Sequence, residues 1–168
     1  MKKYRIYDYN SETDIEQDLT EKDYINFLET CFRHCASCAF IVHDYKYLKP
    51  AFVIPELEKY RIPVADYVIN AYSHYGFESE LRINHHGHHE IRHYKLCTES
   101  CALIRCVTNT LFSWLCDSDF QNPEDLMFFR DDGTVFFDSV MHEGYATVYV
   151  KDNEDISDLL LNPYWKEI

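Results

Sequence analysis

The order of apolar and polar residues along the chain predicts strands and helices in alternation. Residues 4–9 alternate and are rich in Tyr, which favours a first strand. Over 21–36 apolar residues recur three and four positions apart, as in an amphipathic helix, with Thr20 as the expected N-cap. Between them, the charged segment 11–18 is expected to be a solvated loop. Residues 39–43 form a short apolar run that predicts a second strand.

Three further helices are expected along the chain. Pro55 and Pro63 exclude one long helix in this region, so a short helix near 55–60 is predicted. Apolar residues recur at helical spacing from Thr98, its expected cap, to Cys116. A last short helix is expected over 154–161, where Asn162 and Pro163 end it.

A β-hairpin is predicted in the middle of the chain. Its strands are 77–84 and 89–96, joined by the turn His85-His86-Gly87-His88. Placing Asn84 opposite His89 brings acidic residues of the first strand opposite basic residues of the second. This register also gathers apolar residues on the other face of the hairpin.

The last third of the chain predicts a three-stranded meander. Its strands are 126–130, 134–140 and 145–151, and they are separated by the turns Asp131-Asp132-Gly133 and His142-Glu143-Gly144. The complete order of elements predicts an α+β fold, in which a mostly antiparallel sheet carries helices packed on one face. We expect residues 1–168 to form a single domain.

Composition is that of a globular protein in a reducing compartment. The chain has 168 residues, of which 46% are hydrophobic and 16% aromatic, enough to bury a core. No apolar run is long enough to span a bilayer, and no secretory signal follows Met1. Seven Cys without such a signal favour reduced thiols. The sequence therefore predicts a cytoplasmic protein that does not contact a membrane.

The chain is strongly acidic, and this restricts its partners. A formal charge of -13 disfavours direct binding to nucleic acid. It fits plain solubility, a basic protein partner, or mimicry of nucleic acid. The acidic residues bunch over 12–23, 117–125 and 152–158. From the last two bunches, the predicted binding residues are Asp117, Asp119, Glu124, Asp125, Asp152, Glu154, Asp155 and Asp158.

His89-Glu90-Ile91-Arg92-His93 matches the H-E-x-x-H motif of zinc proteases, but its setting argues against that chemistry. The motif needs a helix, where both imidazoles share one face, whereas these residues lie in a predicted strand. At about 3.3 Å per residue, the two His would stand roughly 13 Å apart. One zinc ion with bonds near 2.0–2.1 Å cannot bridge them. Weak metal binding remains open at three His of the hairpin turn, namely His85, His86 and His88.

A C-x2-H-C-x2-C spacing is present at Cys31, His34, Cys35 and Cys38. Cys31 and Cys35 continue the apolar stripe of the first helix, and buried Cys often acts as a small hydrophobe. A zinc site would need ligands from a second element, for which Cys97 and Cys101 are the paired candidates. A redox pair would lie at a helix N-terminus, the opposite end from this one. We therefore expect these Cys to pack in the core.

The C-terminal half resembles a family of short uncharacterised bacterial proteins, some of which are labelled as sporulation-related. The resemblance rests on Leu111-Phe112-Ser113-Trp114-Leu115, on the stretch from Pro123 to Thr134, and on His142-Glu143-Gly144. It covers about the last 80 residues. It implies the same order of elements, and it implies no activity and no catalytic residue.

The sequence favours a non-enzymatic binding protein. Small size, high acidity, 14 Tyr and the lack of a coherent catalytic motif fit an immunity or inhibitor protein that covers a basic toxin or effector. Two alternatives stay open. One is a metal-dependent enzyme or metal-binding protein that uses the His/Cys-rich region, and the other is an inhibitor that mimics nucleic acid. No cofactor is predicted.

Overall fold

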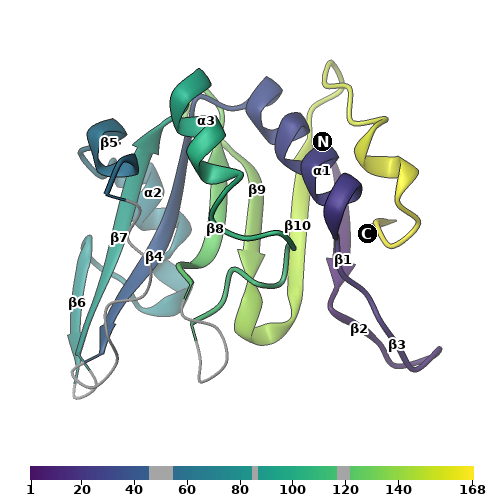
Figure 1. The fold of residues 1–168 in the computed structure, drawn as a ribbon, viewed down its shortest axis with the longest axis horizontal. Coiled ribbons are helices and arrows are strands. Elements are labelled where there is room, and N and C mark those ends of the chain that lie inside the picture. Colours follow the sequence, from purple (N-terminus) through teal and green to yellow (C-terminus); the bar gives the residue numbers. More distant parts are fainter. Residues whose placement is uncertain (46–54, 85–86, 117–121) are drawn as a thin grey trace.

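A nine-stranded antiparallel sheet forms the frame of the molecule (Figure 1). The computed structural model describes residues 1–45, 55–84, 87–116 and 122–168. Its strands, in their order across the sheet, are β11 Lys166–Glu167, β1 Lys2–Tyr7, β10 Tyr145–Val150, β9 Val135–Val140, β8 Glu124–Phe129, β4 Ser37–Tyr45, β7 Gly87–Lys95 and β5 Arg61–Ile62. The remaining strand, β6 Leu81–Asn84, also pairs with β7. The predicted α+β class is confirmed.

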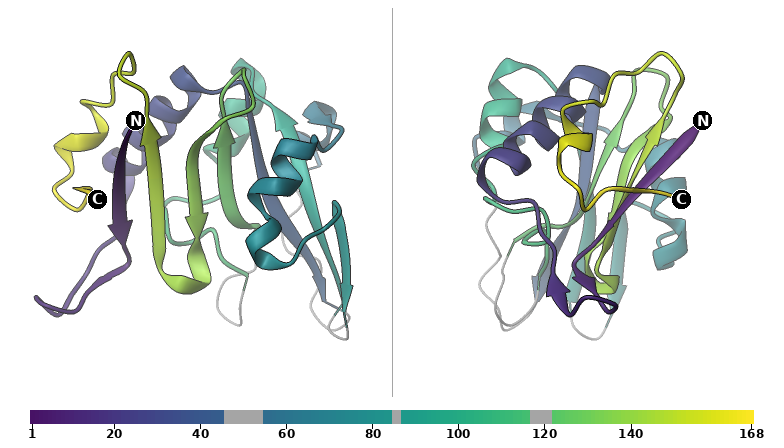
Figure 2. Two further views of the ribbon diagram at one scale, coloured as in Figure 1. Left: turned by 180° about the vertical axis from the view of Figure 1, so that it is seen from behind. Right: turned by 90° about the vertical axis from the view of Figure 1, so that its right-hand side faces the viewer.

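Both faces of the sheet are covered, by different helices. Alternate residues of β4 point to opposite sides, so that Phe40 joins the larger core and Ile41 joins a second, smaller cluster. Helices α1 (Glu21–His34) and α3 (Thr98–Ile104) lie over the larger core, whereas α2 (Asp66–Ala71) covers the other face (Figure 2). The prediction that helices pack on one face therefore holds for α1 and α3. It misses α2, because no helix was expected at 66–71.

The meander is confirmed at all three strands, β8, β9 and β10. Gly133 and Gly144 end its two turns with φ of +77° and +68°, a region that favours glycine. One residue of β9 is extra, since Phe128 pairs with Phe137 but Phe129 pairs with Val135. This β-bulge turns both Phe136 and Phe137 toward the larger core, which gains two buried rings from one strand.

The predicted helix 98–116 is wrong beyond residue 104. Asp18 Oδ1 accepts hydrogen bonds from the backbone N–H groups of Leu111 and Phe112, at 3.0 and 3.1 Å. The Thr108 hydroxyl donates to the Thr110 carbonyl at 2.8 Å. These bonds compete with helical ones, so the chain continues as turns while its apolar residues stay buried. The N-cap is Cys97, whereas Thr98 was expected to hold that position.

The predicted helix over 154–161 is also wrong, except for the 3₁₀ turn η4 (Leu159–Leu161). Asp155 Oδ1 accepts from the Ser157 N–H at 2.9 Å, and Glu154 Oε2 accepts from the Lys151 N–H at 2.7 Å. Such side chain to backbone bonds hold the segment in a loop.

The central hairpin is confirmed as a hairpin, but its first strand β6 begins at Leu81 and not at residue 77, and its predicted register is wrong by two residues. Asn84 pairs with Gly87, and Arg82 pairs with His89. The connection is therefore shorter than expected, because Gly87 already belongs to β7 with φ of +137°. The charge pairing that suggested the register is replaced by a network in which Arg61 and Arg92 both hold Glu90.

The first strand, expected over 4–9, begins and ends two residues earlier as β1. The other elements follow the sequence closely, with one exception. Strand β4 and helix α1 include the predicted ranges almost entirely, Thr20 is the N-cap of α1, and the short helix near 55–60 is the 3₁₀ helix η1 (Leu57–Tyr60). The exception is segment 11–18, which was expected to be a loop. It lies in a small hairpin of β2 (Tyr9–Asn10) and β3 (Ile15–Glu16) that projects from one corner of the sheet (Figures 1 and 2).

Across the described residues, we find no helix with the length and apolar character that crossing a membrane requires.

Candidate functional site

The eight predicted binding carboxylates do not form one surface. Asp117 and Asp119 lie outside the described residues. Three are exposed on the loop that follows β10, namely Asp152, Asp155 and Asp158. The other three, Glu124, Asp125 and Glu154, are withdrawn into contacts within the protein.

Glu154 has a structural role. Its carboxylate binds the guanidinium of Arg130, with Nη2 and Oε2 at 2.7 Å, and the two side chains are only 8% and 6% exposed. Arg130 also donates to the backbone carbonyls of Val135 and Tyr149. A buried charge held this completely is unavailable to a partner, so we assign Glu154 to closure of the loop after β10.

Glu124 and Asp125 meet His142 at the lower end of the meander. Glu124 and Asp125 begin β8, and His142 lies in the 3₁₀ turn η3 (Met141–Glu143) between β9 and β10. His142 Nδ1 lies 3.7 Å from Glu124 Oε1 and 3.9 Å from Asp125 Oδ2. Within the described ranges, this is the one group of three or more His, Cys, Asp or Glu whose ligand atoms all lie within 4.8 Å of one another. We call these three residues the acid–histidine cluster.

A β-bulge brings the two neighbouring carboxylates together. In a regular strand, successive side chains point to opposite faces. Here Ala39 of β4 pairs with Met127 but Ile41 pairs with Glu124, so β8 carries one extra residue. Asp125 adopts φ of +56°, which is uncommon outside glycine, and this turn re-aims its side chain.

The surroundings hold Asp125 in this conformation. The Met141 N–H donates to Asp125 Oδ1 at 2.7 Å, and the buried Tyr72 hydroxyl donates to the Asp125 carbonyl at 2.6 Å. Backbone strain that the fold supports in this way is frequent at functional sites. Burial, together with the charge of Glu124, raises the pKa of Asp125 to about 8.

Two further His extend the acid–histidine cluster along the sheet. His43 of β4 places Nε2 against Glu124 Oε2, and its Nδ1 lies 2.6 Å from Nδ1 of His89. His43 is buried, with 7% exposure. His89 is the first residue of the H-E-x-x-H match. It contacts His43, which in turn contacts Glu124 of the acid–histidine cluster.

The rest of the H-E-x-x-H match lies apart. Its predicted strand conformation is confirmed, because the motif lies within β7. Glu90 is bound by arginines, and His93 is buried against Pro63, whose carbonyl lies 3.3 Å from His93 Nδ1. Of the turn histidines, His85 and His86 lie outside the described residues, and His88 is exposed on β7.

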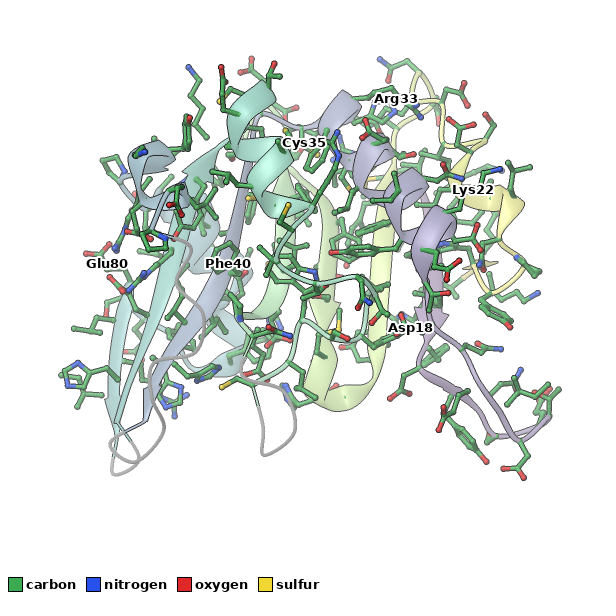
Figure 3. All side chains as sticks on the ribbon, in the orientation of Figure 1. Asp18, Lys22, Arg33, Cys35, Phe40 and Glu80 are labelled. Atoms are coloured by element: carbon green, nitrogen blue, oxygen red, sulfur yellow. The ribbon has the colours of Figure 1, made fainter. Side chains whose placement is uncertain are left out.

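The Cys-rich segment belongs to the core. Cys31 and Cys38 have no exposure, and burial raises the pKa of both thiols well above the usual value. Cys35 caps the C-terminal end of α1 (Figure 3) and lines a hollow of about 350 Å³ with Cys97 and Cys101. The expected core packing is confirmed for Cys31 and Cys38.

The projecting hairpin is a second candidate site, with a different chemistry. We define the acidic hairpin as residues 7–18, a stretch with five carboxylates and no Lys, Arg or His. Asp18 anchors its base (Figure 3) through its bonds to the chain at 111–112. Three large side chains on it are about half exposed, Tyr7 at 46%, Tyr9 at 47% and Ile15 at 49%.

A hollow lies beside the acidic hairpin. It has a volume of about 310 Å³, and Tyr164 and Lys166 of the C-terminal segment line it together with Tyr7 and Tyr9. The sequence signal for this surface was present, since acidic residues bunch over 12–23. The sequence pattern predicts a plain loop here, and it therefore does not connect the acidic residues with the neighbouring Tyr.

Comparison of the chain with models of known protein families, with curated proteins and with solved structures gave no match.

Proposed function

We propose that this protein is a non-enzymatic binding protein that engages a basic protein partner through the acidic hairpin. In the specific form of this proposal, it is an immunity or inhibitor protein that covers a basic toxin or effector. One observation carries the proposal. The acidic hairpin combines exposed apolar and aromatic side chains with carboxylates, on an element that projects from the sheet.

The aromatic and the acidic side chains would contribute to binding in different ways. Tyr supplies a large contact area at a low cost in conformational entropy, so Tyr7 and Tyr9 suit the centre of an interface. Glu12 and Glu16 suit the rim, where charge accelerates encounter with a basic surface. The adjacent hollow offers a place for a side chain of the partner.

The structure of the acidic hairpin also favours a defined binding surface. Its strands pair as Tyr9 with Glu16 and Asn10 with Ile15, and the Tyr9 hydroxyl contacts the carboxylate of Asp14. The Glu12 N–H donates to Asn10 Oδ1 at 2.9 Å. An element ordered before binding loses less entropy when it associates.

The test begins with retrieval of the partner from the native host by cross-linking. Binding kinetics then compare two charge-matched variants, Glu12→Gln/Glu16→Gln in the acidic hairpin and Asp152→Asn/Asp158→Asn in the loop after β10. We expect the first pair to slow association and to flatten its dependence on salt, while the second pair changes neither. We expect Tyr9→Ala to cost about 2 kcal/mol or more of binding free energy, chiefly through faster dissociation.

Three outcomes would reject the proposal. One is an association rate that ignores salt, and another is a partner with an acidic surface. The third is an equal effect of the two charge-matched variants, which would remove the acidic hairpin from the interface.

A further inference from the structure

We propose that the acid–histidine cluster, Glu124, Asp125 and His142, is a binding site for a divalent transition-metal cation of the zinc class. This inference is independent of the proposed function, because it rests on other residues at another place in the fold. It also departs from the prediction of no cofactor. The sequence pattern places His142 in a turn and gives it no role as a ligand.

The distances from His142 to the two carboxylates suit one small cation. Zinc binds imidazole nitrogen at about 2.0–2.1 Å and carboxylate oxygen at about 2.0–2.2 Å. Two ligands of one ion therefore lie at most roughly 4.2 Å apart. The separations from His142 Nδ1 to Glu124 Oε1, 3.7 Å, and to Asp125 Oδ2, 3.9 Å, fall inside this limit.

Each carboxylate is already held by one oxygen and presents the other. Glu124 contacts His43 Nε2 through Oε2 and faces His142 through Oε1. Asp125 accepts the Met141 N–H through Oδ1, is hydrogen-bonded by the Tyr75 hydroxyl, and faces His142 through Oδ2. Metal-ligating carboxylates are commonly oriented by such an outer layer of partners. The orientation of both carboxylates by neighbouring groups separates the acid–histidine cluster from a chance group of acids.

No Lys or Arg of the described residues is paired with the acid–histidine cluster. The side chains of Glu124 and Asp125 retain 12% and 2% of their exposure. Among the described residues, neither forms an ion pair with Lys or Arg, and their ion-pair contacts are to His43 and His142. Burying two adjacent carboxylates as anions is costly unless a cation offsets their charge, and an ion bound between them would do so.

The ligand atoms and their exposure to solvent indicate which kind of ion would bind. Zinc accepts both imidazole nitrogen and carboxylate oxygen and can keep an open position beside three protein ligands, whereas calcium and magnesium prefer oxygen alone. His142 is 48% exposed, so an ion can reach the acid–histidine cluster and keep a water or external ligand.

The test uses the full chain, freed of metal by chelation and titrated with zinc chloride in a calorimeter. We expect one equivalent to bind. Glu124→Gln and His142→Asn should each weaken binding by about tenfold or more, and His43→Gln, which removes an orienting partner, should weaken it about 10–100-fold. Because His142 is half exposed, its replacement leaves the core intact, and circular dichroism verifies the folding of every variant.

The matched control is His88→Asn, which removes an exposed His of β7 outside the acid–histidine cluster. Its affinity for zinc should equal that of the unaltered chain. Loss of binding in His88→Asn with retention in His142→Asn would overturn the proposal and assign binding to the exposed His. Absence of binding by the unaltered chain would overturn it as well. Titration with magnesium should give weaker binding than zinc, and the reverse order would contradict the assigned class of ion.

Discussion

The backbone N–H of Met141 donates a hydrogen bond of 2.7 Å to Oδ1 of Asp125. This bond joins the first strand of the meander to its second turn, and both residues are buried. It therefore fixes the position of η3, and with it His142, relative to the start of β8.

Asp125→Ala should destabilise the protein, because it leaves the Met141 N–H without an acceptor in a buried position. We expect a loss of about 1–3 kcal/mol in the free energy of unfolding. Asp125→Asn is the matched control, since Asn keeps the acceptor oxygen and tolerates positive φ well. Urea unfolding of the three proteins measures the difference. Equal stability of the Ala and Asn variants would show that the bond does not support the turn.

Gly133→Val should destabilise the first turn of the meander. At φ of +77° an added Cβ is strained, and it would lie 2.9 Å from Cδ1 of the Tyr67 ring. Strain of this kind costs on the order of 1–3 kcal/mol. Thermal unfolding tests the change, with Asp131→Ala in the same turn as the control that keeps the glycine. An unchanged melting temperature for Gly133→Val would contradict the described turn.

His93 should make the fold sensitive to acid. It is 1% exposed, and burial lowers its pKa below the ordinary 6.5. A His with a depressed folded pKa contributes stability that is present above the unfolded pKa and is lost as the pH falls through the folded one. Unfolding free energy should therefore fall below about pH 6.5, more steeply than in His93→Gln. Parallel curves for the two proteins would assign the acid sensitivity to other groups.

Thiol labelling of the native protein should divide the Cys by their burial. Cys106 is exposed and should react first, whereas Cys31 and Cys38 have no exposure and should react only after unfolding. Burial keeps these two thiols protonated, and the thiolate is the reactive form. Mass spectrometry after a short pulse of alkylating agent assigns the sites. Labelling of Cys31 as fast as Cys106 would contradict its place in the core.

Strands were predictable where their pattern was local. The meander and β4 could be predicted because each strand is a short apolar or alternating run bounded by turn residues. The hydrophobic period and the flanking turn residues therefore indicate the same element. The H-E-x-x-H match was placed on a strand by the same reasoning. The prediction of a helix over 98–116 is wrong beyond residue 104 because Asp18, far away in sequence, accepts hydrogen bonds from two backbone N–H groups near residue 111. No pattern within the helix contains that information.

The acid–histidine cluster could not be predicted for a related reason. Its acids were named as binding residues because they lie in an acidic bunch, and His142 was assigned to a turn. Their meeting depends on the bulge at Asp125 and on the pairing of β8 with β4 and β9. Both features depend on the tertiary structure, and the periodicity of the sequence does not reveal an extra residue in a strand.

The position of β1 between β10 and β11 sets the order in which the molecule can assemble during translation. Its backbone partners include Val150 for Lys2 and Glu167 for Tyr4, so β1 cannot pair until the segments that contain β10 and β11 have been made. At about 5–20 residues per second, that wait is on the order of ten seconds. The nascent chain meanwhile carries β1 unpaired, and once made, β10 has an open edge until β1 docks. A chaperone that shields β1 during this interval would therefore limit aggregation of the nascent chain.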